Sequence, residues 1–388
     1  MLRKWFIGLL FVTALMLIAG CGFDGMTKAS DPEKQTLGKV PLMLYLADQQ
    51  GKEGDLDKQK LVLATWDLNK GSISLGNKPT LLEDHVQGLQ GAKLVWAGDN
   101  SALVCTTDAL RSGSIRNGSS QDFKLEKVEV KSSASSLVVY KAQDAHNIMT
   151  AYWERATSGN SLTTNSNPKA VRIIVEIRKA NHVEKRVLVA KLPHDPIGVQ
   201  PLLVYGTPDN YSVLVSYDHY SKKESGAIKG SLILGNVNGK SVHWDNIKGE
   251  YCSFIAGGGS DLVKLGNKVF IDACGGLVMV LDLRHKPMKL TPYKPVNEQI
   301  KMIQERIVDV PVHPVFGAYG DILVMALPGF YDQWVWAIEN DKCVGKIHLD
   351  SQKSKLTIYK DNISTQKQLL PDIPRGFVLP RDGYGTWK

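Results

Sequence analysis

The fold is decided by the stretch Val278-Met-Val-Leu-Asp-Leu-Arg-His-Lys-Pro-Met288, in which an apolar run ends at an acidic residue and a polar turn leads back to an apolar residue. The same order recurs in Leu63-Ala-Thr-Trp-Asp-Leu-Asn-Lys-Gly-Ser-Ile73 and in Val335-Trp-Ala-Ile-Glu-Asn-Asp-Lys-Cys-Val-Gly345. Short apolar runs bounded by Gly, Asn, Asp and Ser are typical of β-strands joined by tight turns. Each stretch therefore predicts a β-hairpin.

The hairpins belong to a larger repeat. Looser versions occur at Leu232–Val242, with Asn238-Gly239 as the predicted two-residue turn, and at Ile173–Val187. Strands that would precede the hairpins begin 45 to 65 residues apart along the chain, which suits a four-stranded sheet with loop insertions. They begin near Pro41, Ser101, His146, Tyr211, Lys268 and Asp321.

This repeat resembles the β-propellers of quinoprotein-like and WD-repeat proteins, in which each blade is a four-stranded antiparallel sheet. The resemblance implies an all-β fold of six four-stranded blades over residues 40–388, with seven blades as the alternative because Lys355–Lys388 is long enough to complete another sheet. One helix, over Pro295–Val308, is predicted from its period of apolar residues. A pair of all-β sandwich domains is the rival architecture.

A propeller also predicts how its ring closes. Strands from opposite ends of the chain must pair, because an open ring would expose long strand edges. The strand Pro41–Ala47 begins an N-terminal blade that is one strand short. We expect the missing strand to be Gly376–Pro380 or Lys355–Tyr359, which have the required apolar character.

The first twenty residues predict export. A short basic start precedes the 15 uncharged, mostly apolar residues Trp5–Ala19, which is shorter than the roughly 20 residues that a spanning helix needs. The following Ile18-Ala-Gly-Cys21 resembles the lipobox of bacterial lipoproteins. The resemblance implies cleavage between Gly20 and Cys21, a lipid on Cys21, and anchoring at the extracytoplasmic face of the cell membrane. An uncleaved membrane helix is the alternative.

Composition and charge limit the remaining choices. The chain has 388 residues, of which 43% are hydrophobic and 22% charged, as in ordinary folded proteins. Its net charge of +8 is not gathered into a basic run, so nucleic acid is not an expected partner. The predicted organisation is a signal peptide at 1–20, a lipidated N-terminus and flexible tether at 21–39, and the propeller at 40–388.

Motifs that would identify a reaction are absent from the sequence. It contains no Cys-x-x-Cys, His-Glu-x-x-His or Gly-x-Ser-x-Gly, so neither a cofactor nor a metal is expected. The pairs His194-Asp195 and Asp218-His219 place an imidazole next to a carboxylate, as a general base would require, and are the candidate catalytic residues. Loop residues with ordinary hydrogen bonds are the competing interpretation.

Recurring residues have structural interpretations. The acidic residues Asp67, Asp282 and Glu339 hold one position in their hairpins and are expected to accept backbone N–H bonds across the turn. Cys252 and Cys274 could form a disulfide on neighbouring strands, or remain buried thiols. Six tryptophans are expected to pack in the core or between blades: Trp66, Trp96, Trp153, Trp244, Trp334 and Trp336.

Two classes of function fit these features. The favoured one is a non-catalytic, membrane-tethered binding or scaffold module that holds a protein or an envelope polymer through its blade loops. The alternative is an extracytoplasmic hydrolase or lactonase of the propeller type. An enzyme of that type should bring His and acidic residues from at least three blades together in the central channel.

Overall fold

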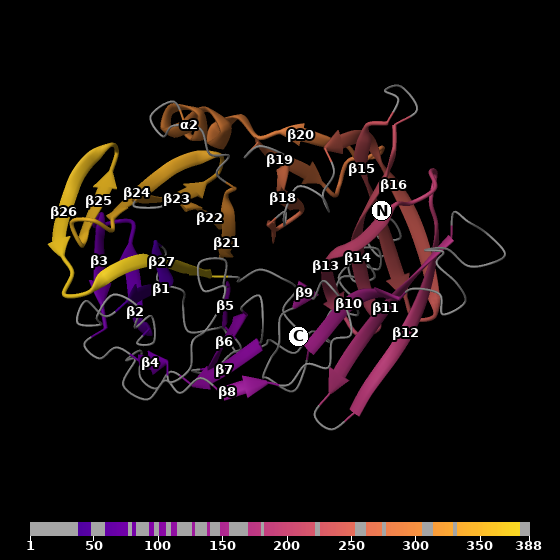
Figure 1. The fold of residues 1–388 in the computed structure, drawn as a ribbon, viewed down its shortest axis with the longest axis horizontal. Helices are drawn as coiled ribbons and strands as arrows, with labels where there is room; N and C mark the ends of the chain where they lie inside the picture. The colour runs from indigo at the N-terminus through magenta and orange to yellow at the C-terminus, as the bar shows by residue number, and fades with distance from the viewer. Residues whose placement is uncertain are drawn as a thin grey trace, which may run out of the picture. The chain divides into compact units, whose positions relative to one another are not determined.

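Strands make up most of the chain that the computed structural model describes (Figure 1). Within each strand the side chains alternate between the two faces, and many strands are apolar on both faces. In Asn210–Tyr220 (β14), for example, the eight residues from Val213 to Tyr220 include seven that are buried. Sheets with two apolar faces must be covered on both sides. The structure describes residues 38–47, 59–76, 80–82, 93–96, 101–105, 110–114, 126–128, 138–139, 148–154, 170–179, 182–221, 226–252, 261–273, 277–304, 313–328 and 332–380.

The first sheet contains both ends of the described chain. Its strands run in the order β3-β2-β1-β27-β5-β6-β7-β8, and β4 pairs with β2 off this path. The strands are Lys39–Ala47 (β1), Gln59–Asp67 (β2), Ser72–Leu75 (β3), Thr80–Leu82 (β4), Lys93–Trp96 (β5), Ser101–Cys105 (β6), Leu110–Ser114 (β7), Glu126–Val128 (β8) and Ile373–Pro380 (β27).

The next three sheets each have four antiparallel strands. The second is Val138–Val139 (β9), Ile148–Glu154 (β10), Ala170–Lys179 (β11) and His182–Lys191 (β12). The third is Gly198–Thr207 (β13), β14, Ile228–Asn238 (β15) and Ser241–Cys252 (β16). The fourth is Leu262–Leu265 (β17), Lys268–Ala273 (β18), Leu277–Asp282 (β19) and Leu290–Pro292 (β20).

The fifth sheet has six antiparallel strands. It is built from Val315–Tyr319 (β21), Ile322–Pro328 (β22), Asp332–Glu339 (β23), Lys342–Asp350 (β24), Lys355–Lys360 (β25) and Ile363–Leu369 (β26). From the second sheet onward, each sheet contacts the next in chain order, and the fifth contacts the first: β9 and β10 touch β13, β16 touches β20, β17 touches β21, and β21 touches β27. Successive antiparallel sheets that each contact the next are the arrangement of a β-propeller, as the repeat predicted.

The closing strand is β27. It pairs antiparallel with β1, so that Met43 lies opposite Val378 and Leu44 opposite Phe377, and its end pairs in parallel with β5 (Figure 1). The prediction that Gly376–Pro380 completes the N-terminal sheet is therefore confirmed. The other predicted strand, Lys355–Tyr359, is wrong for this role because it lies in β25 between β24 and β26.

Two apolar clusters hold the sheets together. One lies mainly between the first and fifth sheets and includes Leu42, Trp66, Ile347 and Phe377, all at most 1% exposed. The other runs through the second to fifth sheets. Burial of apolar surface between sheets is the main stabilising contribution in such a fold.

An additional contact joins β26 to the outer edge of β3. The side-chain amide of Gln366 accepts a hydrogen bond from the Ile73 N–H at 2.7 Å and donates one to the Ile73 carbonyl at 3.1 Å. Thr365 Oγ1 also donates to the Gly71 carbonyl. One side chain thus satisfies both backbone groups of an edge residue, as a neighbouring strand would.

The predicted hairpins are all present, with one correction to a turn. Asn238 pairs with Ser241, so the two turn residues are Gly239 and Lys240 rather than Asn238 and Gly239. Gly239 has a φ of 58°, and a positive φ at the first central residue alone is the pattern of a type II′ turn. The turn was misplaced by one residue because strand register, which sequence does not show, fixes it.

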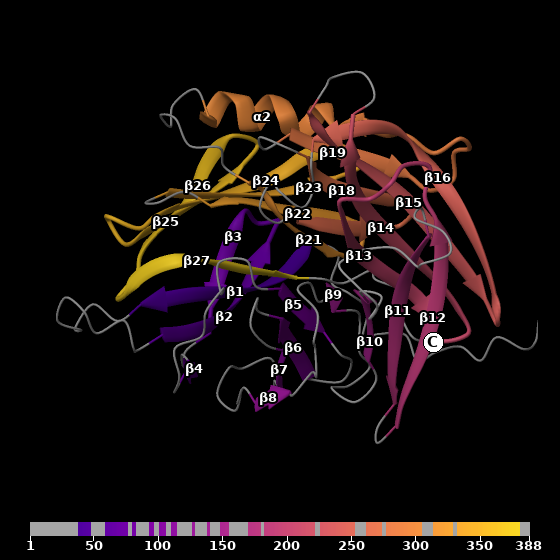
Figure 2. The ribbon, with the colours of Figure 1, turned by 45° about the vertical axis from the view of Figure 1, so that its right-hand side comes forward.

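The predicted helix is also present as Lys294–Gln304 (α2), beside β19 and β23 (Figure 2). Its side chains Val296 and Ile300 are at most 2% exposed, as its period predicted, and Gln299 accepts a hydrogen bond from the indole of Trp336. No helix among the described residues has the length and apolar character needed to cross a bilayer.

Several predictions lie outside the described residues. These are the signal peptide with Gly20 and Cys21, the tether up to residue 37, and the packing of the Trp96 side chain. The proposed disulfide also lies outside them, because Cys274 and the side chain of Cys252 are not described.

Candidate functional site

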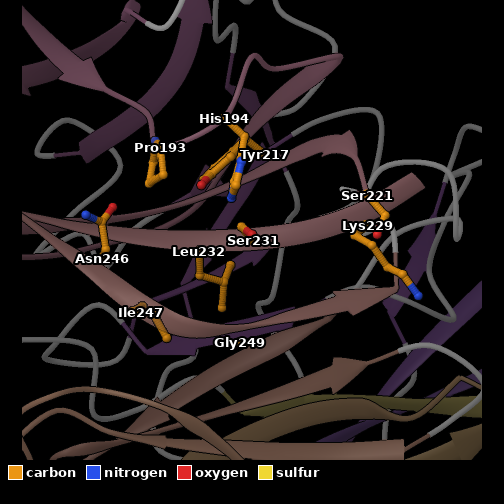
Figure 3. Close-up of a pocket in the computed structure, with 10 residues that line it drawn as sticks. All are labelled: Pro193, His194, Tyr217, Ser221, Lys229, Ser231, Leu232, Asn246, Ile247 and Gly249. Carbon is orange, nitrogen blue, oxygen red and sulfur yellow. The ribbon is translucent and has the colours of Figure 1, made fainter. Parts of the chain in front are cut away.

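A cavity of about 550 Å³ lies at one end of the third sheet (Figure 3). It is bounded by the connection between β12 and β13, which carries His194, and by the ends of β14, β15 and β16. Its volume falls within the range of small-molecule sites. The residues that line it are Pro193, His194, Tyr217, Ser221, Lys229, Ser231, Leu232, Asn246, Ile247 and Gly249.

The lining is polar and holds no carboxylate. Imidazole, phenol, hydroxyl, ammonium and amide groups are all represented, and none of the ten lining residues is acidic. In the view of Figure 3, Asn246 lies to the left and Lys229 to the right of Ser231. A cavity with several hydrogen-bonding groups and one lysine favours a polar ligand with oxygen acceptors.

His219 contacts two residues of the lining, Ser231 and His194, and is 1% exposed. Its Nδ1 is 3.1 Å from the Tyr220 carbonyl oxygen, and its Nε2 is 2.9 Å from Ser231 Oγ. A carbonyl oxygen can only accept, so Nδ1 carries a hydrogen; when the ring holds that hydrogen alone, Nε2 accepts the hydrogen of the Ser231 hydroxyl. The backbone thereby fixes which nitrogen faces the serine.

His194 covers one face of His219. The two rings stack with their centroids 4.2 Å apart and their planes 20° from parallel, while the centroid of Tyr217 lies 5.6 Å from that of His219. Cross-strand geometry explains the cluster, because Tyr217 is paired with Ser231 and His219 with Lys229, so all four side chains project from one face of the sheet.

The structure places the residues of the two sequence-predicted pairs in a different combination. It brings His194 and His219 together, although they are 25 residues apart in sequence. It does not pair either histidine with its neighbouring acid: Asp195 is exposed, and Asp218, at 4% exposure, lies on the opposite face of β14 from His219. Adjacent residues in a strand point to opposite faces, so the side chains of Asp218 and His219 lie on different sides of β14.

A second polar cluster joins the fourth and fifth sheets. His313 Nδ1 is 2.7 Å from Asp272 Oδ2, and Asp261 accepts a hydrogen bond from the Phe316 backbone N–H. The Asp272 side chain is 2% exposed, and its Oδ1 is buried without a hydrogen-bond partner. Burial raises the pKa of Asp272 to about 6; the hydrogen bond from His313 opposes the increase and the charge of Asp261 adds to it.

Replacing Asp272 should change how stability depends on pH. A carboxyl with a raised pKa favours the folded state when protonated, and this contribution is lost as pH rises from about 4 through 6. The loss amounts to about 3 kcal/mol for a shift of roughly two pKa units. We expect the unfolding free energy of the wild type to fall relative to that of Asp272→Asn between pH 4 and pH 7.5, as measured by urea titration. Parallel pH profiles would contradict this.

Neither cluster is the site expected of a central-channel enzyme. Each draws its side chains from no more than two neighbouring sheets, rather than from three. Within the described part of the chain, no group of three or more His, Cys, Asp or Glu residues is arranged to hold a metal ion.

Two of the recurring acids have the predicted structural role. Asp67 Oδ1 accepts the Lys70 backbone N–H and Asp282 Oδ1 accepts that of Arg284, each at 3.0 Å. Hydrogen bonds from Arg284 lower the pKa of Asp282 to about 2. Glu339 differs, because it precedes a turn in which Asn340 and Asp341 both have positive φ.

Five of the six tryptophans are core residues, as predicted. Trp66 and Trp336 are buried, whereas Trp153, Trp244 and Trp334 are partly buried and pack against the larger cluster. Trp334 stacks on His348 with ring centroids 4.3 Å apart. The described free cysteine is Cys343, and burial raises the pKa of its thiol, which makes it a poor nucleophile.

The sequence missed Ser231, Tyr217 and Lys229. No local pattern marks these residues. They lie on β14 and β15, and only the register between these two strands brings them together. A bulge between Gly230 and Leu232 in the β15–β16 pairing adds an irregularity beside Ser231 that no alternation pattern reveals.

No known protein family and no curated protein matches the chain. Solved structures with a similar fold include a candidate 6-phosphogluconolactonase from Bacteroides uniformis, at 10% identity over 88% of this chain and 99% of that chain with a TM-score of 0.40. The β-propeller domain of Cps50 (Swd1) from Myceliophteria thermophila has 10% identity over 84% and 97%, with a TM-score of 0.35. AztD from Citrobacter koseri has 8% identity over 87% and 97%, with a TM-score of 0.29. At such identities, a shared arrangement of strands does not imply a shared activity.

Proposed function

We propose that the protein is a lipid-anchored, extracytoplasmic binding protein that takes a polar ligand, such as the end of an envelope polymer, into the cavity of the third sheet. The observation that carries this proposal is the cavity itself, where a loop and three strand ends present His194, Lys229, Ser231 and Asn246 to one space. Polar groups that converge in a concave site on a rigid sheet are typical of ligand binding.

Binding would be tested with a panel of soluble anionic polymers and neutral sugars by isothermal titration calorimetry. A ligand that uses the cavity should bind at least about tenfold more weakly to Asn246→Ala and to His194→Ala, the loss expected for one hydrogen bond of about 1.4 kcal/mol. The matched control is His285→Ala, since His285 is 78% exposed in a turn of the fourth sheet. Equal loss in the control, or none in the cavity variants, would refute the cavity as the site.

The anchor is proposed from Ile18-Ala-Gly-Cys21. Two acyl chains would hold the protein stably at a membrane, at about 0.8 kcal/mol for each buried methylene. Cys21→Ser should abolish labelling by a radioactive fatty acid and leave a heavier, unprocessed precursor in the expressing bacterium. Undiminished lipid labelling of that variant would refute the anchor.

We also propose six blades. In support, the first sheet divides at the parallel β27–β5 pair into β3-β2-β1-β27 and β5-β6-β7-β8, each of four strands like the second, third and fourth sheets. In this interpretation β25 and β26 extend the last blade and do not form a seventh.

A further inference from the structure

The hydrogen bond between Ser231 and His219 has the geometry of a nucleophile and its base. Ser231 Oγ lies 2.9 Å from Nε2, within the range over which a base can remove a hydroxyl proton. The Tyr220 carbonyl accepts from Nδ1 at 3.1 Å and holds the ring in the tautomer that a base requires. A serine, a histidine and a third group that orients the histidine are the three parts of an activated serine.

The surroundings of the pair differ from those of an ordinary core hydrogen bond. Ser231 is 6% exposed and is one of the residues that line the cavity. His219 is 1% exposed, and the ring of His194 stacks on one of its faces. Because the hydroxyl hydrogen points to Nε2, the lone pairs of the Ser231 oxygen point away from His219.

We propose that Ser231 is an acyl-accepting nucleophile, with His219 as its general base, toward small carboxylic esters that enter this cavity. Ser231 Oγ attacks the carbonyl carbon and its proton passes to His219 Nε2. The bond to the leaving alkoxide then breaks, and that alkoxide departs as an alcohol with the proton from Nε2. Water, activated by the same nitrogen, releases the acid and restores the serine. Each turnover consumes one ester and one water and yields one acid and one alcohol.

The rest of the cavity supplies charge stabilisation. Lys229 and Asn246 line the same cavity and carry ammonium and amide N–H groups, the kind of donor that stabilises an oxygen on which negative charge develops. The lack of acidic side chains in the lining favours an ester that itself carries oxygen-rich or anionic groups. This activity goes beyond the binding proposed above and does not require the binding ligand to be known.

A fluorophosphonate probe tests the proposal directly, because it bonds covalently to activated serines. The probe is incubated with the folded protein, and the modified residue is located by peptide mass spectrometry. We expect labelling of Ser231 in the wild type, loss of at least about tenfold in rate in His219→Gln, and none at that position in Ser231→Ala. The matched control is Ser212→Ala, which removes a serine of the same sheet that does not line the cavity and should leave the labelling of Ser231 unchanged. No labelling of the wild type, or equal labelling of Ser231→Ala, would overturn the proposal.

A second variant covers the case in which His219→Gln fails to fold. In Ser231→Cys the sulfur takes the place of the oxygen, and a neighbouring base lowers the pH at which a thiolate forms. Its alkylation by iodoacetamide should reach half-maximal rate at least about one pH unit below that of Ser221→Cys. Identical pH profiles for the two thiols would show that His219 only holds the serine in place, and would overturn the proposal.

Discussion

Deletion of residues 373–388 is expected to leave a chain that aggregates and shows no cooperative unfolding transition near that of the full protein. The deletion removes β27, which lies between β1 and β5 and buries Phe377, Val378 and Leu379 to at most 1% exposure. Its loss would expose an edge of β1 and an edge of β5, and unpaired strand edges promote association between chains. Light scattering and differential scanning calorimetry would measure both effects.

The control for this deletion is removal of residues 381–388, which leaves β27 whole. That shorter deletion should melt as the full chain does. Two independent sandwich domains would behave differently, since the N-terminal domain would keep its own transition after the longer deletion. A soluble product with an unchanged first transition would therefore favour that architecture over the closed ring.

Gly317→Val is expected to destabilise the protein by about 3 kcal/mol or more, through overpacking of a closed interface. A Cβ at Gly317, in β21, would lie 2.5 Å from the Pro380 carbonyl oxygen and 2.8 Å from Leu379 Cβ. One of these atoms belongs to the backbone of β27, which cannot move away without disturbing its pairing with β5. Urea titration would give the change in unfolding free energy.

Gly266→Ala serves as the comparison. Gly266 has a φ of 54°, but nothing lies within 4 Å of the Cβ position, so the cost is the conformational strain alone, about 1 kcal/mol. A Gly317→Val protein no less stable than Gly266→Ala would mean that β21 and β27 are not in contact.

The predictability of the fold and that of the site differ for a physical reason. Hairpins such as Leu63–Ile73 are local, and their period and turn residues are visible in a dozen consecutive positions. The pairing of Gly376–Pro380 with Pro41–Ala47 was also predictable, because an incomplete first sheet requires an apolar partner strand. The exact position of the turn at Gly239 and Lys240 could not be predicted, because a shift of the turn by one residue changes the fit of the sequence to a hairpin only slightly.

The cavity depends on placements that no local pattern records. His194 and His219 were identified as residues of interest, but their joining depends on how the β12–β13 connection folds over β14. Nothing in the sequence marks Ser231, since a serine in a strand is common. Only the register that places it opposite Tyr217 brings it into contact with His219. The raised pKa of Asp272 likewise results from its burial and from the charge of Asp261, neither of which the sequence shows.

The position of β1 has a mechanical consequence. This strand begins at Lys39, the second residue described, and is paired along its length with β2 on one side and for most of its second half with β27 on the other. Antiparallel hydrogen bonds lie perpendicular to the strands, so a pull on the N-terminal end along the axis of β1 loads many of them at once in shear. They cannot then break one after another, as they would if the strand were peeled away. A tension applied through the preceding residues would therefore be shared across the sheet that also contains β27, the last strand of the described residues.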